Sequence, residues 1–292
     1  MPAGENINKT MDRADLKSAE AQRIIRELNE LVVRLRREEL RASSWYGTFG
    51  LSGDPDSLER INRGYGYEAI TEPAIDRDFP WFLYWEIVWV TLNAEFSPGQ
   101  RVLDLGGSSS LFSYYLASRG LDVTTVDLQR HLVANGDEVA RRTGWKLTNH
   151  RQDMRTMEFD ERFDHITSIC VYEHIPMFAR VEINRNIERL LVPGGRFSIT
   201  FDYRNPSRFA RIDTPEDVAE QFVAPSGLQV RGNERLHDNG ISYLLHPFYH
   251  PGTTWEYRLA NIRNGHFGRL EVLRRKRAND YTFAALFQEK GP

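Results

Sequence analysis

The sequence predicts an α/β protein whose mostly parallel sheet carries helices on both faces. From about Gln100 onward, short apolar segments alternate with helical ones, the pattern of parallel strands joined by crossover helices. Within RVLDLGGSSSLFSYYLASRG, Arg101 to Gly120, an apolar strand ends in an acid, a glycine turn follows, and a helix begins. Such a unit presents backbone N–H groups to a ligand at the carboxyl end of a parallel sheet.

The segment before this sheet is predicted to be a helical and aromatic cover. Residues 1 to about 11 are expected to be disordered, and a long amphipathic helix is predicted from Asp12 to about Arg41. We favour a helix packed on the flank of the domain; a lid over the active site and a dimerisation helix, which would make a homodimer, are the alternatives. Residues 42 to 80, rich in glycine, proline and aromatic side chains, are predicted to be irregular.

The chain is therefore divided into a cover segment, residues 1–93, and a domain, residues 94–292, with an insertion at about 203–240. Strands are predicted at Arg101–Asp104, Asp122–Asp127, Lys146–Asp153, Phe163–Val171, Gly195–Asp202, roughly Gly240–His246, and Thr282–Glu289. Helices are predicted at Trp81–Asn93, Leu111–Ser118, His131–Thr143, Phe178–Leu191 and, after the Thr214–Pro215 start signal, Glu216–Phe222.

Composition narrows the function classes. The formal net charge is −3, without the basic excess of nucleic-acid binders, and the basic RRKR run at Arg274–Arg277 is interpreted as a solvated hairpin tip. The most apolar run, Trp81 to Leu92, is interrupted by Glu86 and is too short to span a bilayer. The first residues contain no apolar signal core, so a cytoplasmic location is expected. The single cysteine, Cys170, excludes an internal disulfide, and no metal site is predicted.

Polar features follow four successive predicted strands at their carboxyl ends, where ligands bind in open α/β sheets. Asp104 ends the first strand, Asp127 the second and Asp153 the third, and the fourth runs into VYEHI. A carboxylate at the second strand suits a ribose diol, and one at the third suits the amine of adenine. Asp104 suits an ammonium group and would repel a pyrophosphate. Ribose, adenine and an amino-acid ammonium together describe S-adenosylmethionine and disfavour NAD.

Residues from about 100 to 203 resemble the class I S-adenosylmethionine-dependent methyltransferases, which have a Rossmann-like fold. VLDLGGSSS is similar to the family's glycine-rich first motif, VTTVDL to its acidic second motif, and RQDM to its adenine-contacting loop. FDHITSICVYEHI is similar to the fourth motif, and LLVPGGRFSIT to the turn that enters the fifth strand. The resemblance implies a seven-stranded sheet whose last strand, Tyr281 to Gln288, is antiparallel.

The resemblance also implies the cofactor contacts, position by position. The methionine part would lie at the first turn, the ribose at the second strand, the adenine at the third, and the edge between methionine and ribose at the fourth. The residues so assigned are Asp104, Gly106, Gly107 and Ser108; Asp127 and Leu128; Asp153 and Met154; and Cys170 with Val171. Ser108 and Ser110 replace two glycines of the family pattern. We expect them to cap the following helix and to offer hydroxyls to a carboxylate.

The sequence offers several candidates for the residues that contact the methyl acceptor. His174, in YEHI, is the best-placed proton acceptor, because the ordinary pKa of histidine lies near neutrality, and the alternative is that it only orders the loop. Tyr172 and the pair Asp202 and Tyr203 are also expected to point toward the substrate. His246 and His250 have a spacing that holds metals on helices, but Pro247 and Pro251 argue against a helix there.

The predicted function is methyl transfer from S-adenosylmethionine to an oxygen or nitrogen of a small-molecule acceptor. Aromatic side chains, which tolerate dispersing positive charge, gather in the cover segment at Trp45, Tyr46, Tyr65, Tyr67, Trp81 and Trp85. The alternative is a cofactor-binding scaffold or partner subunit of the same fold without transfer activity. A nucleotide-dependent redox protein is a third interpretation, which Asp104 disfavours.

Overall fold

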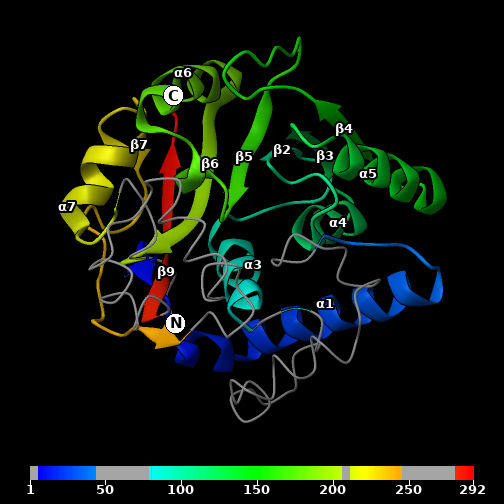
Figure 1. Cartoon of the computed structure of the whole chain (residues 1–292), viewed down its shortest axis with the longest axis horizontal. Helices are drawn as coiled ribbons and strands as arrows, with labels where there is room; N and C mark the ends of the chain where they lie inside the picture. Colours follow the sequence, from blue (N-terminus) through cyan, green and yellow to red (C-terminus); the bar gives the residue numbers. More distant parts are fainter. Residues whose placement is uncertain (1–5, 44–78, 80, 206–210, 245–279) are drawn as a thin grey trace, which may run out of the picture.

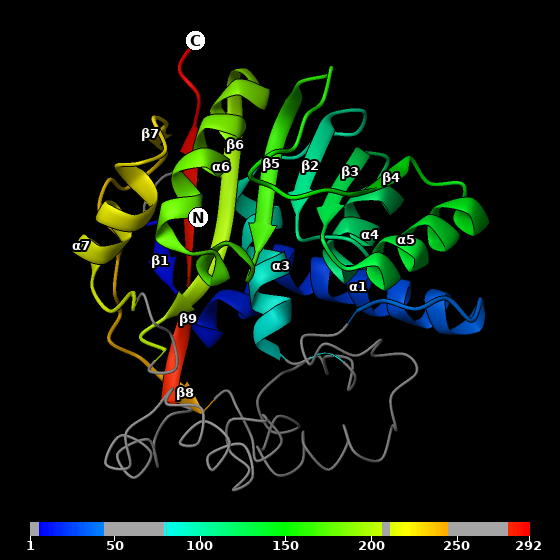
Figure 2. The same ribbon diagram turned by 45° about the horizontal axis from the view of Figure 1, so that its top comes forward.

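A mixed sheet forms the centre of the protein in a computed structural model that describes residues 6–43, 79, 81–205, 211–244 and 280–292 (Figure 1). Its order is β1-β9-β6-β5-β2-β3-β4, and β7 and β8 also pair with β9. The long strands lie side by side in this order in Figure 2. They are β2 Arg101–Leu105, β3 Asp122–Asp127, β4 Leu147–Arg151, β5 Phe163–Ile169, β6 Leu191–Tyr203 and β9 Asp280–Glu289.

The predicted fold class is confirmed. Strands β4, β3, β2, β5 and β6 are mutually parallel, and β9 runs antiparallel to β6. The predicted start of β6 at Gly195 is wrong, because the strand begins at Leu191, which pairs with Phe163. A register shift follows before His165 pairs with Arg196, so the Pro-Gly-Gly turn forms an irregularity inside the strand.

The outer edge of β9 differs from the prediction of one seventh strand. Seven positions lie across the sheet, but the described residues contain nine strands, three of them only two residues long. These are β1 Lys9–Thr10, β7 Gln229–Val230 and β8 Tyr243–Leu244, and each pairs antiparallel with a different part of β9. The edge that a single strand would cover is thus shared by distant segments.

The expected disorder of the first residues is wrong for residues 6–11. Asn8 is fully buried, and its side-chain carbonyl accepts a hydrogen bond from the backbone N–H of Phe287 at 2.8 Å. Its Nδ2 donates to the carbonyls of Arg231 and Asn233 at 2.6 and 2.8 Å. One asparagine therefore ties the N-terminal segment to β9 and to the segment after β7. Composition gave no sign of this contact because its partners lie more than 220 residues away.

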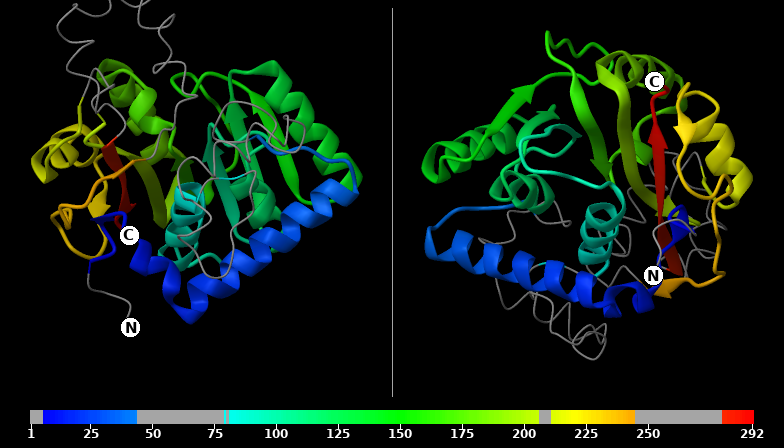
Figure 3. Two further views of the ribbon diagram at one scale, coloured as in Figure 1. Left: turned by 60° about the horizontal axis from the view of Figure 1, so that its bottom comes forward. Right: turned by 180° about the vertical axis from the view of Figure 1, so that it is seen from behind.

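Helices cover both faces of the sheet, as predicted. One apolar core joins α1, α3, α4 and α5 to the sheet, and a second joins α6, α7 and η4 to the opposite face. Figure 3 shows α1, in blue, running along the α3 and α4 side. The helices are η1 Arg13–Lys17, α1 Ala19–Arg37, α3 Trp81–Asn93, α4 Leu111–Ser118, α5 Arg130–Thr143, η3 Tyr172–His174, α6 Met177–Leu190, α7 Pro215–Val218 and the π-helical η4 Ala219–Val223.

The single long N-terminal helix of the prediction is divided in two. Ser18 ends the 3₁₀ helix η1 and caps α1, accepting a hydrogen bond from Ala21 N through its hydroxyl at 3.1 Å. The apolar stripe of α1, including Ile24, Leu28 and Leu35, is buried in the chain's own core. This burial supports the interpretation of α1 as a helix packed on the flank of the domain. Among the helices of the described ranges, none is long and apolar enough to cross a membrane.

His165 gives the fold a pH dependence that can be measured. Its side chain is buried on β5, and burial, followed by the charge of Arg196, lowers its pKa to about 4. Between pH of about 6.5 and about 4 the unfolded chain binds a proton that the folded chain does not, so stability falls as the pH falls. We expect the wild type to lose on the order of 3 kcal/mol more than His165→Gln over this range, by urea unfolding. The exposed His237→Gln should follow the wild type; a His165→Gln protein that did so would contradict the prediction.

Candidate functional site

The turn between β2 and α4 is built around the buried carboxylate of Asp104. The hydroxyl of Ser113 donates to Oδ2 at 2.5 Å, and that of Thr167 on β5 donates to Oδ1 at 2.9 Å. Burial raises the pKa of Asp104 to about 6, against these hydrogen bonds and one from Ser110. The carboxylate therefore fixes the turn itself, and its predicted contact with a ligand ammonium stays a prediction.

The two glycines of this turn are required by close approaches. Gly106 has a φ of +78°, and a Cβ there would lie 2.7 Å from Val171 Cγ1. A Cβ on Gly107 would lie 1.9 Å from Asp104 Oδ2. The turn thus passes directly over the carboxylate at the carboxyl end of β2, as the sequence predicts.

The serines stabilise the turn from within. Ser110 caps α4, with its Oγ accepting from Ser113 N at 2.9 Å, which confirms the expected capping. The Oγ of the buried Ser108 lies 2.7 Å from Thr125 Oγ1 on β3. Ser109 takes the left-handed conformation, with a φ of +65°, and donates to the carbonyl of Leu132 at 2.6 Å. Serine hydroxyls therefore tie the turn to α5 and β3.

Asp127 and Leu128 lie together at the carboxyl end of β3. The backbone N–H of Gln129 donates to Asp127 Oδ1 at 2.8 Å. Burial raises the pKa of Asp127, against hydrogen bonds from the backbone of Gln129 and Leu128. The side chain of Leu128 is 62% exposed, an unusual position for a large apolar group. A carboxylate beside an exposed apolar side chain suits a ribose with its base alongside.

Asp153 is already paired within the chain. Arg155 donates to its two oxygens from Nε at 3.1 and 3.0 Å, and this interaction lowers the pKa of Asp153. The carbonyl of the adjacent Met154 accepts from Asn186 on α6 at 3.2 Å. A contact of Asp153 with an adenine amine stays a prediction, and the carboxylate would have to share it with Arg155.

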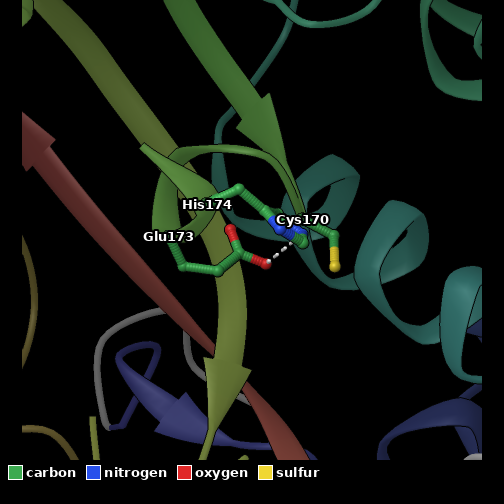
Figure 4. A group of neighbouring side chains, drawn as sticks. All are labelled: Cys170, Glu173 and His174. Atoms are coloured by element: carbon green, nitrogen blue, oxygen red, sulfur yellow. Dashed lines mark ion pairs between the residues drawn. The ribbon is translucent and has the colours of Figure 1, made fainter. Parts of the chain in front are cut away.

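The loop after β5 brings together Cys170, Glu173 and His174 (Figure 4). Cys170 has a φ of +52°, and His174 Nε2 lies 3.7 Å from Glu173 Oε1. One ligand atom from each residue lies within 4.8 Å of the others, a cluster that the sequence did not indicate. Burial, followed by the charge of Glu173, raises the pKa of the Cys170 thiol well above its ordinary value. Since metals bind the thiolate, this environment disfavours a metal there.

Arg180 of α6 holds this loop in place through hydrogen bonds to its backbone carbonyls. Its buried guanidinium donates from Nε to the carbonyl of Ile175 at 2.9 Å and from Nη2 to that of Glu173 at 2.8 Å. Nη1 donates to Gln221 Oε1 of η4 at 3.0 Å. The sequence did not indicate this role of Arg180, because its partners are backbone carbonyls, which every residue carries.

Tyr172 and Tyr203 do not face the substrate side, which corrects that expectation. Both are fully buried in the core on the α6 face. The hydroxyl of Tyr172 donates to Asn184 Oδ1, and that of Tyr203 to Asp238 Oδ2 at 3.1 Å. Because successive residues of a strand point to opposite faces, the orientation of Tyr203 leaves Asp202 on the α3 face.

Glu86 lies close to Glu173 of this loop, although the sequence showed it only as an interruption of an apolar run. It lies on α3, fully buried, and Thr200 of β6 donates to its Oε1 at 2.7 Å. Burial, then the nearby Glu173 and Asp202, raise its pKa well above the ordinary value. The signal in the sequence was a lone glutamate among aromatic residues. His246, His250, Trp45, Tyr46, Tyr65, Tyr67 and Arg274–Arg277 lie outside the described residues.

Residues 102–195 match the family model described as a methyltransferase domain. The chain is 28% identical over 166 residues to an S-adenosyl-L-methionine-dependent Diels-Alderase of Talaromyces variabilis, covering 54% of the chain and 53% of that protein. It is 32% identical over 108 residues to a ubiquinone biosynthesis O-methyltransferase of Coxiella burnetii, covering 37% of the chain and 45% of the relative. The chain thus spans about half the length of these curated relatives.

Solved structures share the fold. The [4+2]-cyclase SpnF aligns with a TM-score of 0.50 and 17% identity, covering 70% of this chain and 80% of SpnF. The YcgJ protein of Bacillus subtilis aligns with a TM-score of 0.51 and 17% identity, covering 72% of this chain and 99% of YcgJ. The matched segment contains the turn at Asp104, the Asp127 strand end and the loop at Cys170. Residues 102–195 are therefore similar to methyltransferase domains, and the chain shares a Rossmann-like fold with these solved structures.

Proposed function

We propose that this protein transfers a methyl group from S-adenosylmethionine to an oxygen or nitrogen of a small-molecule acceptor. The observation that carries the proposal is the Gly106–Gly107 turn over Asp104, one strand away from Asp127 and its exposed neighbour Leu128. Both features lie in the segment that matches the methyltransferase family model.

The residues at the strand ends fit the proposed cofactor. Asp127 would accept hydrogen bonds from the ribose hydroxyls, and the exposed Leu128 would cover the adenine. The turn at Gly106 and Gly107 and the edge at Cys170 would hold the methionine part. When bound, S-adenosylmethionine supplies a methyl group already activated on a sulfonium. The chain has to bind, align and desolvate the reactants.

His174 is the proposed proton acceptor for the acceptor group. Its side chain is 46% exposed beside the buried side chain of Glu173, so it can reach a bound molecule while the loop holds it in place. Its Nε2 lies 3.7 Å from Glu173 Oε1, so a carboxyl group stands beside the imidazole that would take up the proton. The alternative is that His174 only orders the loop. Full turnover by His174→Ala would exclude the role of proton acceptor.

A second candidate function keeps the cofactor and omits the transfer. It is favoured by one observation: one relative and one fold neighbour have names that denote a Diels-Alderase and a [4+2]-cyclase. A protein of this second kind would bind S-adenosylmethionine without converting it to S-adenosylhomocysteine. Release of S-adenosylhomocysteine in the presence of amine and hydroxyl acceptors is therefore the measurement that separates the candidates.

Calorimetry with S-adenosylmethionine, S-adenosylhomocysteine and NAD tests the cofactor. We expect both sulfur compounds to bind and NAD not to bind. Asp127→Ala should weaken both by about tenfold to a hundredfold, since two ribose hydrogen bonds to a charged group are lost. Asp122→Ala, at the opposite end of β3, is the matched control and should bind like the wild type. If neither sulfur compound binds the wild-type protein, the proposed function fails.

A further inference from the structure

A buried group of three carboxyl groups lies where β5 and β6 end, and the proposed methyl transfer uses only Glu173 among them, beside His174. Glu86 comes from α3, Glu173 from η3 and Asp202 from β6. All three residues are at most 5% exposed. Asp202 N donates to Glu173 Oε1 at 3.4 Å, and Cys170 Sγ lies 3.9 Å from Asp202 Oδ1. We call Glu86, Glu173 and Asp202 the carboxyl cluster.

Glu86 points into the cluster with one oxygen unsatisfied. Its Oε1 accepts from Thr200, which lies two residues before Asp202 on the same face of β6. Its Oε2 is buried and has no hydrogen-bond partner within the described ranges. A buried, unsatisfied carboxyl oxygen costs free energy, on the order of 1–3 kcal/mol or more, unless a ligand satisfies it. The arrangement therefore has a place for a donor that the described chain does not supply.

The charged groups that act on Glu86 are acidic, whereas Glu173 also has His174 and Arg180 beside it. Burial and the carboxylates of Glu173 and Asp202 raise the pKa of Glu86, and only the hydrogen bond from Thr200 acts in the opposite direction. The guanidinium of Arg180, whose charge interacts with Glu173, donates its hydrogen bonds to carbonyl groups and to Gln221. A cation that entered beside Glu86 Oε2 would meet an unsatisfied acceptor and, next to it, two further acidic groups.

The cluster also lies in the right place for an acceptor molecule. It adjoins Cys170, which under the proposed function lies at the methionine and ribose edge of the cofactor. Trp85 and Phe82, one and four residues before Glu86 on the same helix, are buried in the apolar core. An anion would be repelled here, and a neutral hydroxyl would not offset the repulsion from Glu173 and Asp202 that raises the pKa of Glu86.

We infer that Glu86, Glu173 and Asp202 bind a cationic amino group of the acceptor, so that the acceptor is an amine. This inference rests on the proposed function, since it deepens the choice between oxygen and nitrogen acceptors. An ammonium group offers three N–H donors and a positive charge, which match the unsatisfied oxygen of Glu86 and its two acidic neighbours. The bound nitrogen would give one proton to His174, the proposed proton acceptor, and its freed lone pair would then take the methyl group and leave S-adenosylhomocysteine. Glu86 is then a specificity residue contributed by the cover segment.

The test uses two small probes of similar size, ethanolamine and ethylene glycol, added to the full chain saturated with S-adenosylhomocysteine. Binding is followed by ligand-observed NMR. We expect ethanolamine to bind and ethylene glycol not to bind, and Glu86→Gln to weaken ethanolamine by about tenfold or more. Asp202→Asn should weaken it similarly, and it serves as the second variant if Glu86→Gln does not fold. Glu216→Gln, which removes an exposed carboxylate paired with Arg235, is the control and should bind like the wild type.

The outcomes separate this inference from the proposed function. Equal binding of both probes, absence of ethanolamine binding, or unchanged binding by folded Glu86→Gln and Asp202→Asn overturns the amine inference. So does a loss of S-adenosylhomocysteine affinity in Glu86→Gln, which would assign the cluster to the cofactor, or Zn²⁺ binding that requires Glu86. The proposed function fails only if the wild-type protein does not bind S-adenosylmethionine or S-adenosylhomocysteine.

Discussion

Gly107→Ala is expected to abolish measurable binding of S-adenosylmethionine. The new Cβ would lie 1.9 Å from Asp104 Oδ2 and 2.7 Å from Ser113 Oγ. The carboxylate cannot retreat, because Ser113 and Thr167 hold its two oxygens in a buried site. The turn itself must shift, and the backbone groups that face the ligand shift with it. Overpacking of this kind also costs about 1–3 kcal/mol of folding stability.

Gly144→Ala is the matched control for this substitution. Gly144 ends α5 with a φ of +69°, and a Cβ there meets nothing within 4 Å. Alanine is strained by about 1–2 kcal/mol in this left-handed conformation, so stability falls without any overlap. We expect Gly144→Ala to bind S-adenosylhomocysteine like the wild type in calorimetry. If Gly107→Ala did the same, the close passage of the turn over Asp104 would be contradicted.

Arg180→Met is expected to lower turnover strongly and to destabilise the protein by about 3–5 kcal/mol. Methionine fills much of the volume beside Tyr172 and Phe222 but donates no hydrogen bond. The carbonyls of Glu173 and Ile175 then lose their donor, and the loop that carries His174 is no longer held. Methyl-transfer rates at saturating cofactor, together with urea unfolding, measure the two effects.

Two further variants, Arg185→Met and His174→Ala, help to interpret the effect of Arg180→Met. Arg185→Met, on the exposed side of the same helix, should change neither stability nor turnover by more than a small factor. His174→Ala should lower kcat while leaving cofactor affinity and stability nearly unchanged, if the loop acts through this imidazole. Full activity in His174→Ala would exclude it as the proton acceptor, and full activity in folded Arg180→Met would show that the loop does not need its anchor.

Local sequence signals predicted the elements whose causes are local. The helices at Trp81–Asn93 and Leu111–Ser118 and the strand at Asp122–Asp127 have the predicted bounds. Ser110 caps the second helix, and an aspartate stands at each end of the strand. The acids at strand ends were likewise visible, since the carboxyl ends of parallel strands meet at one edge. Alternation also predicts which face a strand residue takes, but the wrong face was chosen for Tyr203.

The features that the sequence did not reveal depend on contacts between residues far apart in the chain. Glu86 acquires its significance from Thr200, 114 residues later, and Asn8 from Phe287, 279 residues later. Arg180 acts on backbone carbonyls, which every residue carries and no pattern distinguishes. The carboxyl cluster is assembled from a cover helix, a loop and a strand, so it exists only after the sheet has formed.

The pairing of β1 with β9 determines the order in which this sheet can be completed. Strand β9 lies between β6 and β1, so Lys9 and Thr10 pair with residues 284 and 285. During synthesis the β1 segment leaves the ribosome early and then has no strand to join until residues near Phe287 have been made. Thr200 and Asp202 are held in register by β9 as well. The carboxyl cluster is therefore completed last, and a chain truncated before β9 would keep the turn at Asp104 while losing the strand that holds Thr200 and Asp202 in register.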